Sequence, residues 1–247
     1  DATDGQIIYD GTDITKLKNA PNITLEPAGE GCVRVRGWGK AGHAAMPEGT
    51  VNAIGLVVNY LLDNGLCNDA ERAYLEALKK LHASTAGTGL GIDCADGPFG
   101  PLTIIGGRIY MEEGRLVQTI DSRFPTCTDG DKLAAQVTAA LGSGAQLQDV
   151  DAAEPFYIEA DSPAIQACIN TYNEVTGEDA KPFTMGGGTY ARHFPYAVSF
   201  GPEHVDLPLP EFGGPMHGAN EAAPIDKLLE AVKIYILALL RLEEIDF

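Results

Sequence analysis

The last third of the chain holds the residues best suited to chemistry. His217 lies in Met216–Glu221 (MHGANE), a short loop ahead of a helical segment, where one ring nitrogen could bind a metal ion. Gly186–Arg192 (GGGTYAR) can converge backbone N–H groups on an anion. The run lacks the lysine of a phosphate loop, so a carboxylate is the better candidate ligand. A plain tight turn is the structural alternative for this run, and a backbone-bonded loop histidine is the alternative for His217.

Two further candidates lie earlier in the chain. Arg123 shares a strand face with Asp121 in Asp121–Pro125 (DSRFP), and its guanidinium can hold a carboxylate through two hydrogen bonds. An ion pair with Asp121 explains the arginine equally well. His43 lies in the small-residue turn Gly39–Pro47 (GKAGHAAMP), where it could donate a hydrogen bond to an oxyanion or be a solvated loop histidine. A zinc site needs three or four ligands, and no H-x-x-x-H pair supplies them.

Composition limits the partners of the chain. The 247 residues are 45% apolar, enough for one large domain or two small ones. A net charge of -18 argues against nucleic acid and against an anionic membrane surface as partners. Five cysteines without a C-x-x-C motif predict reduced thiols and a cytoplasmic protein. No apolar run reaches the length of a transmembrane helix.

The elements of the first part of the chain predict an α+β domain. Residues Cys32–Trp38 alternate between apolar and polar, which indicates a half-buried strand. Glu113-Gly114 separates two further strands as a hairpin turn. The other predicted elements are strands at 102–111 and 115–124, helices at 50–63, 69–82 and 131–141, and an extended run at 146–158. This order predicts a ferredoxin-like domain over residues 1–153, with an antiparallel sheet covered on one side by a two-helix layer.

Residues 154–247 have a different pattern. A helix is predicted from Ser162-Pro163 to Gly177, and short apolar runs at 182–185 and 197–200 indicate buried parallel strands. A last helix from Asp226 is predicted to bury Leu228, Leu229, Val232, Tyr235, Ile236, Leu239 and Leu240. Two short strands are too few to form a parallel sheet that helices cover on both faces. We therefore predict an incomplete α/β segment. Its unpaired edges and apolar surface favour association, including a homo-oligomer.

Several stretches together resemble one family in their order and spacing, across nearly the whole chain. It is the family of two-zinc dipeptidases and deacylases that includes carnosinase, aminoacylase and carboxypeptidase G, and most closely the peptidase-V-like bacterial dipeptidases. The matching stretches are Gly37–Ile54 (GWGKAGHAAMPEGTVNAI), Asp121–Pro125, Glu154–Ile158, Asp161–Gly177, Gly186–Arg192 and Met216–Glu221.

The resemblance implies roles for individual residues. His217 matches the last metal-ligand histidine of the family, and His43 matches the histidine of the lid domain that stabilises the tetrahedral oxyanion. Arg123 matches the arginine that holds the substrate's carboxylate. The backbone of the glycine loop contacts the same end of the substrate in the family. Those loop positions are Gly187, Gly188 and Thr189.

The resemblance also implies a reaction. In the family, a water that bridges two zinc ions attacks the peptide bond of a dipeptide with a free C-terminal carboxylate. The other zinc ligands and the general base come from a segment that precedes the lid. We therefore expect this chain to be the lid plus the C-terminal part of the catalytic domain, without zinc or activity unless the N-terminal catalytic half joins it. The alternatives are a non-catalytic peptide- or carboxylate-binding module, and an enzyme completed by a second chain.

Overall fold

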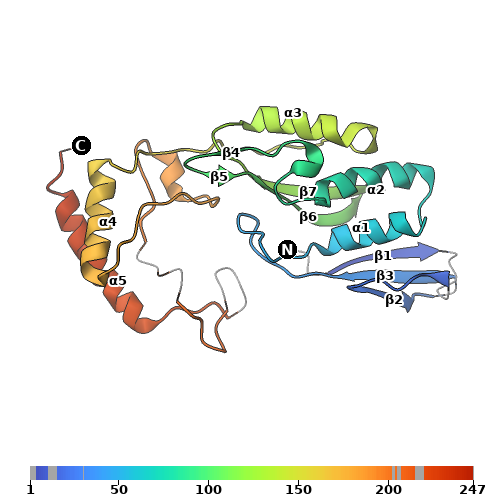
Figure 1. Cartoon of the computed structure of the whole chain (residues 1–247), viewed down its shortest axis with the longest axis horizontal. Helices are drawn as coiled ribbons and strands as arrows, with labels where there is room; N and C mark the ends of the chain where they lie inside the picture. The colour runs from blue at the N-terminus through green and yellow to red at the C-terminus, as the bar shows by residue number, and fades with distance from the viewer. Residues whose placement is uncertain are drawn as a thin grey trace. The chain divides into compact units, whose positions relative to one another are not determined.

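The chain folds as two compact units (Figure 1). The structure is a computed structural model and describes residues 4–10, 16–29, 31–201, 204, 207–214 and 220–246. The first unit contains residues 1–155 with 185–187, and the second contains 156–184 with 188–247. The stretch 185–187 therefore packs with the first unit, although it lies far along the chain.

A three-stranded antiparallel sheet forms one side of the first unit. Its strands are β1 (Asp4–Asp10), β2 (Ile23–Pro27) and β3 (Cys32–Trp38), in the order β1-β3-β2. Alternate residues of β3 are buried, beginning with Val33 and Val35, which confirms the predicted strand. Helix α1 (Ala53–Asp63) packs on β1 and β3. A Cβ at Gly37 would lie 2.7 Å from the Ala53 carbonyl oxygen, so this glycine permits the close approach of helix and strand.

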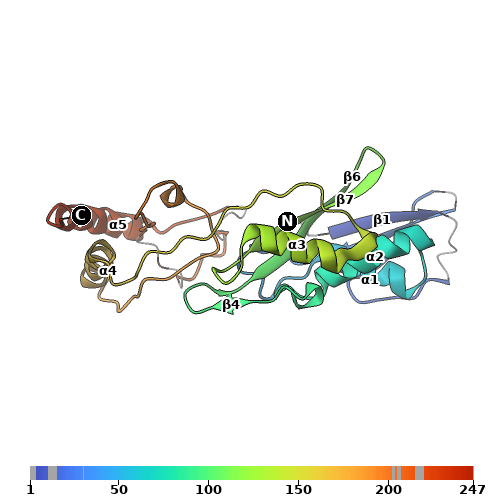
Figure 2. The same ribbon diagram turned by 90° about the horizontal axis from the view of Figure 1, so that it is seen from above.

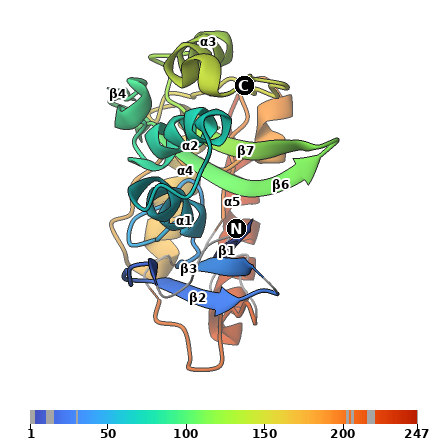
Figure 3. The same cartoon turned by 90° about the vertical axis from the view of Figure 1, so that its right-hand side faces the viewer.

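A separate hairpin forms the second sheet of this unit. Strands β6 (Thr103–Glu112) and β7 (Arg115–Arg123) pair antiparallel, and Glu113 and Gly114 both have positive φ, as the predicted tight turn requires. Helix α2 (Asp69–His82) packs on β6, and α3 (Gly130–Leu141) packs beside α2 (Figure 3). Strands β4 (Ala95–Asp96) and β5 (Gly100–Pro101) form a short ribbon before the hairpin.

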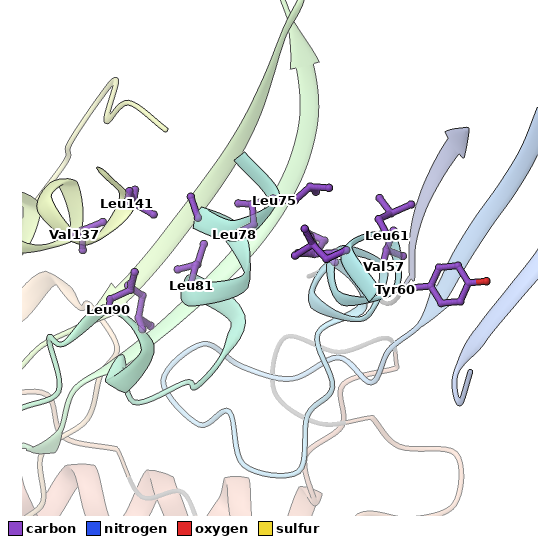
Figure 4. Packing of buried hydrophobic residues seen from close by; sticks show 14 of the residues in the cluster. Val57, Tyr60, Leu61, Leu75, Leu78, Leu81, Leu90, Val137 and Leu141 are labelled. Atoms are coloured by element: carbon purple, nitrogen blue, oxygen red, sulfur yellow. The ribbon is translucent and has the colours of Figure 1, made fainter. Parts of the chain in front are cut away.

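The predicted α+β class is confirmed, but the strands do not form the single sheet that was expected. Strands β1 and β2 occupy both edges of β3, so no edge of β3 remains for the hairpin to pair with. Helices α1 and α2 join the two sheets instead, because their apolar faces share one core (Figure 4). Its fully buried members include Val35, Val57, Val58, Leu102 and Ile104. The extended run predicted at 146–158 forms no strand.

The second unit contains two helices that pack against each other. Helix α4 (Pro163–Thr176) ends at Gly177 with φ 76°, as predicted, and lies beside α5 (Ile225–Leu242) (Figure 1, Figure 2). Ile234 and Ala238 are the buried residues of α5. Arg241 joins the helices through hydrogen bonds of 2.8 Å to Thr171 Oγ1 and 2.6 Å to Glu174 Oε2. Among the described residues, no helix combines the length and apolarity needed to cross a membrane.

Two predictions for the second unit are wrong. The described residues form no strand at 182–185 or 197–200, and Phe183 is 78% exposed. A buried strand needs neighbouring strands, and none lies beside these runs in the described structure. The apolar face of α5 that was predicted to be buried is exposed, because α4 packs on the opposite face. We call this face the α5 stripe: Leu228, Leu229, Val232, Tyr235, Ile236, Leu239 and Leu240.

His82, at the end of α2, occupies a slot between two glycines. A Cβ at Gly55 would come 3.0 Å from His82 Cβ, and a Cβ at Gly106 would come 2.4 Å from His82 Cε1. Burial lowers the pKa of His82 from 6.5 to about 4, against the opposing influence of the neighbouring Gln118 side chain. The folded protein therefore holds this imidazole neutral at pH values where the unfolded chain protonates it.

Acid should destabilise the first unit through His82. Because the pKa is lower in the folded state, the stabilisation is complete above pH 6.5 and is lost as the pH falls toward 4, by about 3 kcal/mol in total. Urea unfolding at pH 7.0 and 4.5 measures the loss in wild type and in His82→Gln. We expect the variant to lose about 2 kcal/mol less between these pH values. The exposed His193, changed to Gln, is the control, and equal losses in all three proteins would contradict the prediction.

Candidate functional site

The loop between β3 and α1 positions His43. Backbone hydrogen bonds between Lys40 and Val51, of 2.9 and 3.0 Å, close this loop at its base. Within it, the backbone N–H of Ala45 donates to His43 Nδ1 over 3.1 Å, and the side chain is half-buried. Because Nδ1 accepts this bond, the neutral ring carries its proton on Nε2. Nε2 is thus the ring atom that can donate to an oxyanion.

Arg123 ends β7 and forms a two-pronged ion pair with Asp121. Its Nε and Nη2 atoms each lie 2.9 Å from one carboxylate oxygen of Asp121. The strand spacing therefore places both side chains on one face, as predicted. Nη2 donates a hydrogen bond to Asp121, whereas Nε lies close to the carboxylate without forming a hydrogen bond, so Nη1 is the part that remains for a second carboxylate. Both readings of the sequence, ion pair and carboxylate grip, are compatible with this geometry.

Gly186 brings three predicted site segments together in the first unit. A Cβ at this position would lie 2.7 Å from Ala45 Cβ and 3.3 Å from the Cβ and Cγ atoms of Arg123. The start of the glycine run is therefore in close contact with the His43 loop and with the stem of Arg123. Only glycine fits here without displacing its neighbours. Gly187 belongs to the same unit.

Gly188 and Thr189 belong to the second unit, where they line an open hollow. Its volume is about 570 Å³, and the residues around it are Gly188, Thr189, Tyr190, Arg192 and His193. The Thr189 hydroxyl accepts a hydrogen bond from the Ala191 N–H over 3.3 Å and lies 2.6 Å from Ser199 Oγ. These bonds use the side chain of Thr189, so a ligand would have to be held by the backbone of the run, as the sequence suggests.

His217 lies outside the described residues, so its role as a metal ligand stays a prediction. Within the part of the chain that the structure describes, no group of three or more His, Cys, Asp or Glu side chains is placed to hold a metal ion. The described residues therefore do not form a zinc site by themselves.

The structure also contains a polar cluster that the sequence did not indicate. His204 is 8% exposed, with Nδ1 2.8 Å from Glu178 Oε1 and Nε2 2.9 Å from Glu230 Oε1. Tyr172 donates its hydroxyl to Glu178, and burial together with this carboxylate raises the pKa of Tyr172 to about 12. Both ring nitrogens of His204 are occupied, so the cluster joins α5 to the end of α4. His204 also opens an H-x-D triplet, but Asp206 lies outside the described residues.

Comparison with known proteins identifies the family. The model of "Peptidase family M20/M25/M40" matches residues 14–241. The putative dipeptidase YtjP of Bacillus subtilis is 28% identical over 225 residues, which cover 89% of this chain and 47% of YtjP. The Beta-Ala-Xaa dipeptidase of Lactobacillus delbrueckii subsp. lactis is 27% identical over 206 residues, covering 83% of this chain and 43% of that protein. This chain thus spans less than half the length of these relatives. The family that the motifs resemble is confirmed, and the chain belongs to peptidase family M20/M25/M40.

Proposed function

We propose that this chain is part of a metal-dependent dipeptidase, in which it supplies the lid and the grip on the substrate. The observation that carries the proposal is the close contact of Gly186 with Arg123 and with the His43 loop. It joins a cation that can hold a carboxylate to a loop whose histidine can donate to an oxyanion. Relatives named as dipeptidases support the reaction class.

The substrate in this proposal is a dipeptide with a free C-terminal carboxylate. Arg123 holds that carboxylate through Nη1, while Asp121 fixes the orientation of the guanidinium from its other edge. The backbone N–H group of Gly187, which belongs to the same unit, contacts the same end of the substrate. His43 donates from Nε2 to the oxygen that becomes negatively charged when the peptide carbonyl is attacked.

Two zinc ions complete the site in this proposal, and His217 is the ligand that this chain supplies. A bound zinc ion would activate water and polarise the peptide carbonyl. The other ligands and the general base belong to a metal-binding half outside the described residues, and the exposed α5 stripe supports the binding of such a partner. We call this chain together with that half the complete enzyme. A cytoplasmic location, which the free cysteines favour, is part of the proposal.

Substitution of Arg123 tests the carboxylate grip. In the complete enzyme, Arg123→Lys should lower kcat/KM for a dipeptide about 10- to 100-fold, because a charge-assisted hydrogen bond to the substrate is lost. The same dipeptide with a C-terminal amide should be hydrolysed equally by wild type and variant, since it lacks the carboxylate. Arg108→Lys is the matched control, because Arg108 is an exposed arginine on the partner strand of the same hairpin.

The outcome also distinguishes the alternative function. If Arg123→Lys affects the free dipeptide and its amide equally, Arg123 does not hold the carboxylate. If the 247-residue chain alone binds dipeptides tightly in calorimetry and the metal-binding half adds no hydrolysis, a carboxylate-binding module replaces the enzyme proposal. We expect the chain alone to be inactive and to bind zinc weakly.

A further inference from the structure

Two of the five cysteines meet in the first unit. The Cys94 and Cys127 side chains are neighbours that influence each other's protonation, although they lie far apart in the sequence. Cys94 directly precedes β4, is partly buried and packs against the hydrophobic core. Cys127 lies in the turn between β7 and α3, and its side chain is exposed. Cys127 is therefore the more accessible thiol of the two.

A carboxylate holds the two backbone segments together beside these thiols. Asp96 Oδ2 accepts hydrogen bonds of 2.6 Å from both the backbone N–H and the hydroxyl of Thr126. Asp96 Oδ1 accepts from the Phe99 N–H over 2.8 Å, and the Cys94 carbonyl accepts from the Leu102 N–H over 2.8 Å. Hydrogen bonds that do not involve sulfur thus hold the residues near each cysteine in place. They keep the two thiols close to each other.

We propose that Cys94 and Cys127 form a redox-sensitive pair, which a low-molecular-weight disulfide converts into an intramolecular disulfide. The Cys127 thiolate attacks one sulfur of the small disulfide, forms a mixed disulfide and releases one small thiolate. The Cys94 thiolate then attacks the Cys127 sulfur and releases the second small thiolate. Two protein thiols are oxidised and one small disulfide is reduced to two thiols, which take up the two protons.

The order of attack follows from the environment of each sulfur. Burial, together with the neighbouring Cys127 side chain and the Asp96 carboxylate, raises the pKa of Cys94 to about 11, against the opposing influence of Lys132. Cys94 is therefore almost entirely protonated at neutral pH, and a protonated thiol does not attack a disulfide. Exposed Cys127 reacts first and Cys94 closes the bond slowly, so closure should accelerate about tenfold per pH unit until the pH approaches 11.

Closure would fix the segment that follows the proposed carboxylate grip. Cys127 lies shortly after Arg123 at the exit of β7, and α3 begins just beyond it. A covalent link to the segment before β4 restricts the movement of this turn. The disulfide should raise the thermal midpoint of the first unit by about 5–10 °C. The thiol chemistry of the two cysteines does not depend on whether the chain is part of a dipeptidase.

Treatment of the 247-residue chain with oxidised glutathione tests the pair. We expect titratable thiols to fall from five to three. A tryptic digest without reductant should contain residues 81–108 linked to residues 124–132. Cys94→Ser should stop at a mixed glutathione disulfide on Cys127, and Cys127→Ser should leave Cys94 unmodified. Cys67→Ser and Cys168→Ser are the controls, and both should still form the linked peptide.

Two results would overturn the inference. The first is a linked peptide that contains another cysteine, or five titratable thiols after treatment. The second is a mixed disulfide that persists on Cys127 in the wild type at pH 9, where Cys94 should displace the glutathione. A rate of closure that does not change between pH 7 and 9 would contradict the assigned order of attack.

Discussion

Replacing His43 by alanine is expected to lower kcat of the complete enzyme about 10²- to 10³-fold and to leave KM nearly unchanged. The Ala45 N–H donates to Nδ1, so the proton that the neutral ring can give lies on Nε2. That bond to the substrate oxygen strengthens only as negative charge develops, so its loss raises the barrier without weakening the bound ground state. Steady-state kinetics with a dipeptide measure both constants.

The loop that carries His43 requires its own control. Thr50→Val removes the 2.7 Å hydrogen bond from the Thr50 hydroxyl to the Pro47 carbonyl without touching the histidine. A much smaller effect of Thr50→Val would show that the imidazole, not general loosening of the loop, carries the rate. Added imidazole should restore part of the activity of His43→Ala and none in Thr50→Val. An unchanged kcat in His43→Ala would contradict the oxyanion role.

Local patterns predicted the elements of the first unit well. The alternation in Cys32–Trp38, the turn at Glu113-Gly114 and the helix at Asp69–His82 each contain the signal that defines them, and the structure confirms all three. The strands β1 and β2 are not among the elements that the sequence predicts. Their pairing with β3 joins residues that are distant in the sequence. This pairing explains why the structure contains two separate sheets where the sequence predicts one.

The second unit shows where the same reasoning fails. The period of α5 correctly predicts a helix with an apolar stripe, but periodicity does not say which face packs against a partner. Residues on the opposite face, Ile234 and Ala238, pack against α4. Likewise, an apolar run such as 182–185 becomes a buried strand only if a neighbouring strand exists. Burial depends on the partner, and a pattern within one segment contains no information about it.

The candidate site shows the same difference between local features, which the sequence predicts, and contacts between distant segments, which it does not. The side-by-side placement of Asp121 and Arg123 follows from strand spacing alone. The contact of Gly186 with Arg123 and the pairing of Cys94 with Cys127 join segments that are distant in sequence, so no spacing rule could reveal them. His204 belongs to the same class, because both of its carboxylate partners lie 26 residues away.

Introducing acidic residues into the α5 stripe should abolish association of this chain with its metal-binding half. Val232 and Ile236 are both 55% exposed and lie one helical turn apart in the stripe. Burying each aliphatic side chain contributes about 1.5–3 kcal/mol, so Val232→Asp with Ile236→Asp should weaken association by about 10²- to 10⁴-fold. Titration calorimetry between the two halves measures this loss, and dipeptide hydrolysis by the mixture should disappear with it.

The two substitutions leave the α4–α5 contact intact, which makes the result interpretable. Ile234 and Ala238 face α4, so the helical circular dichroism should not change. Lys233→Asp is the control, because it makes the net charge more negative by the same amount at a residue outside the α5 stripe. The Lys233→Asp protein should bind the metal-binding half as the wild type does.

Without the metal-binding half, the wild-type stripe should drive the chain to self-associate in sedimentation experiments, and the double variant should sediment as a monomer. A wild-type chain that remains monomeric, and that binds the other half as tightly as the double variant does, would show that the stripe is not a binding surface. The exposed apolar face would then have no role in completing the site.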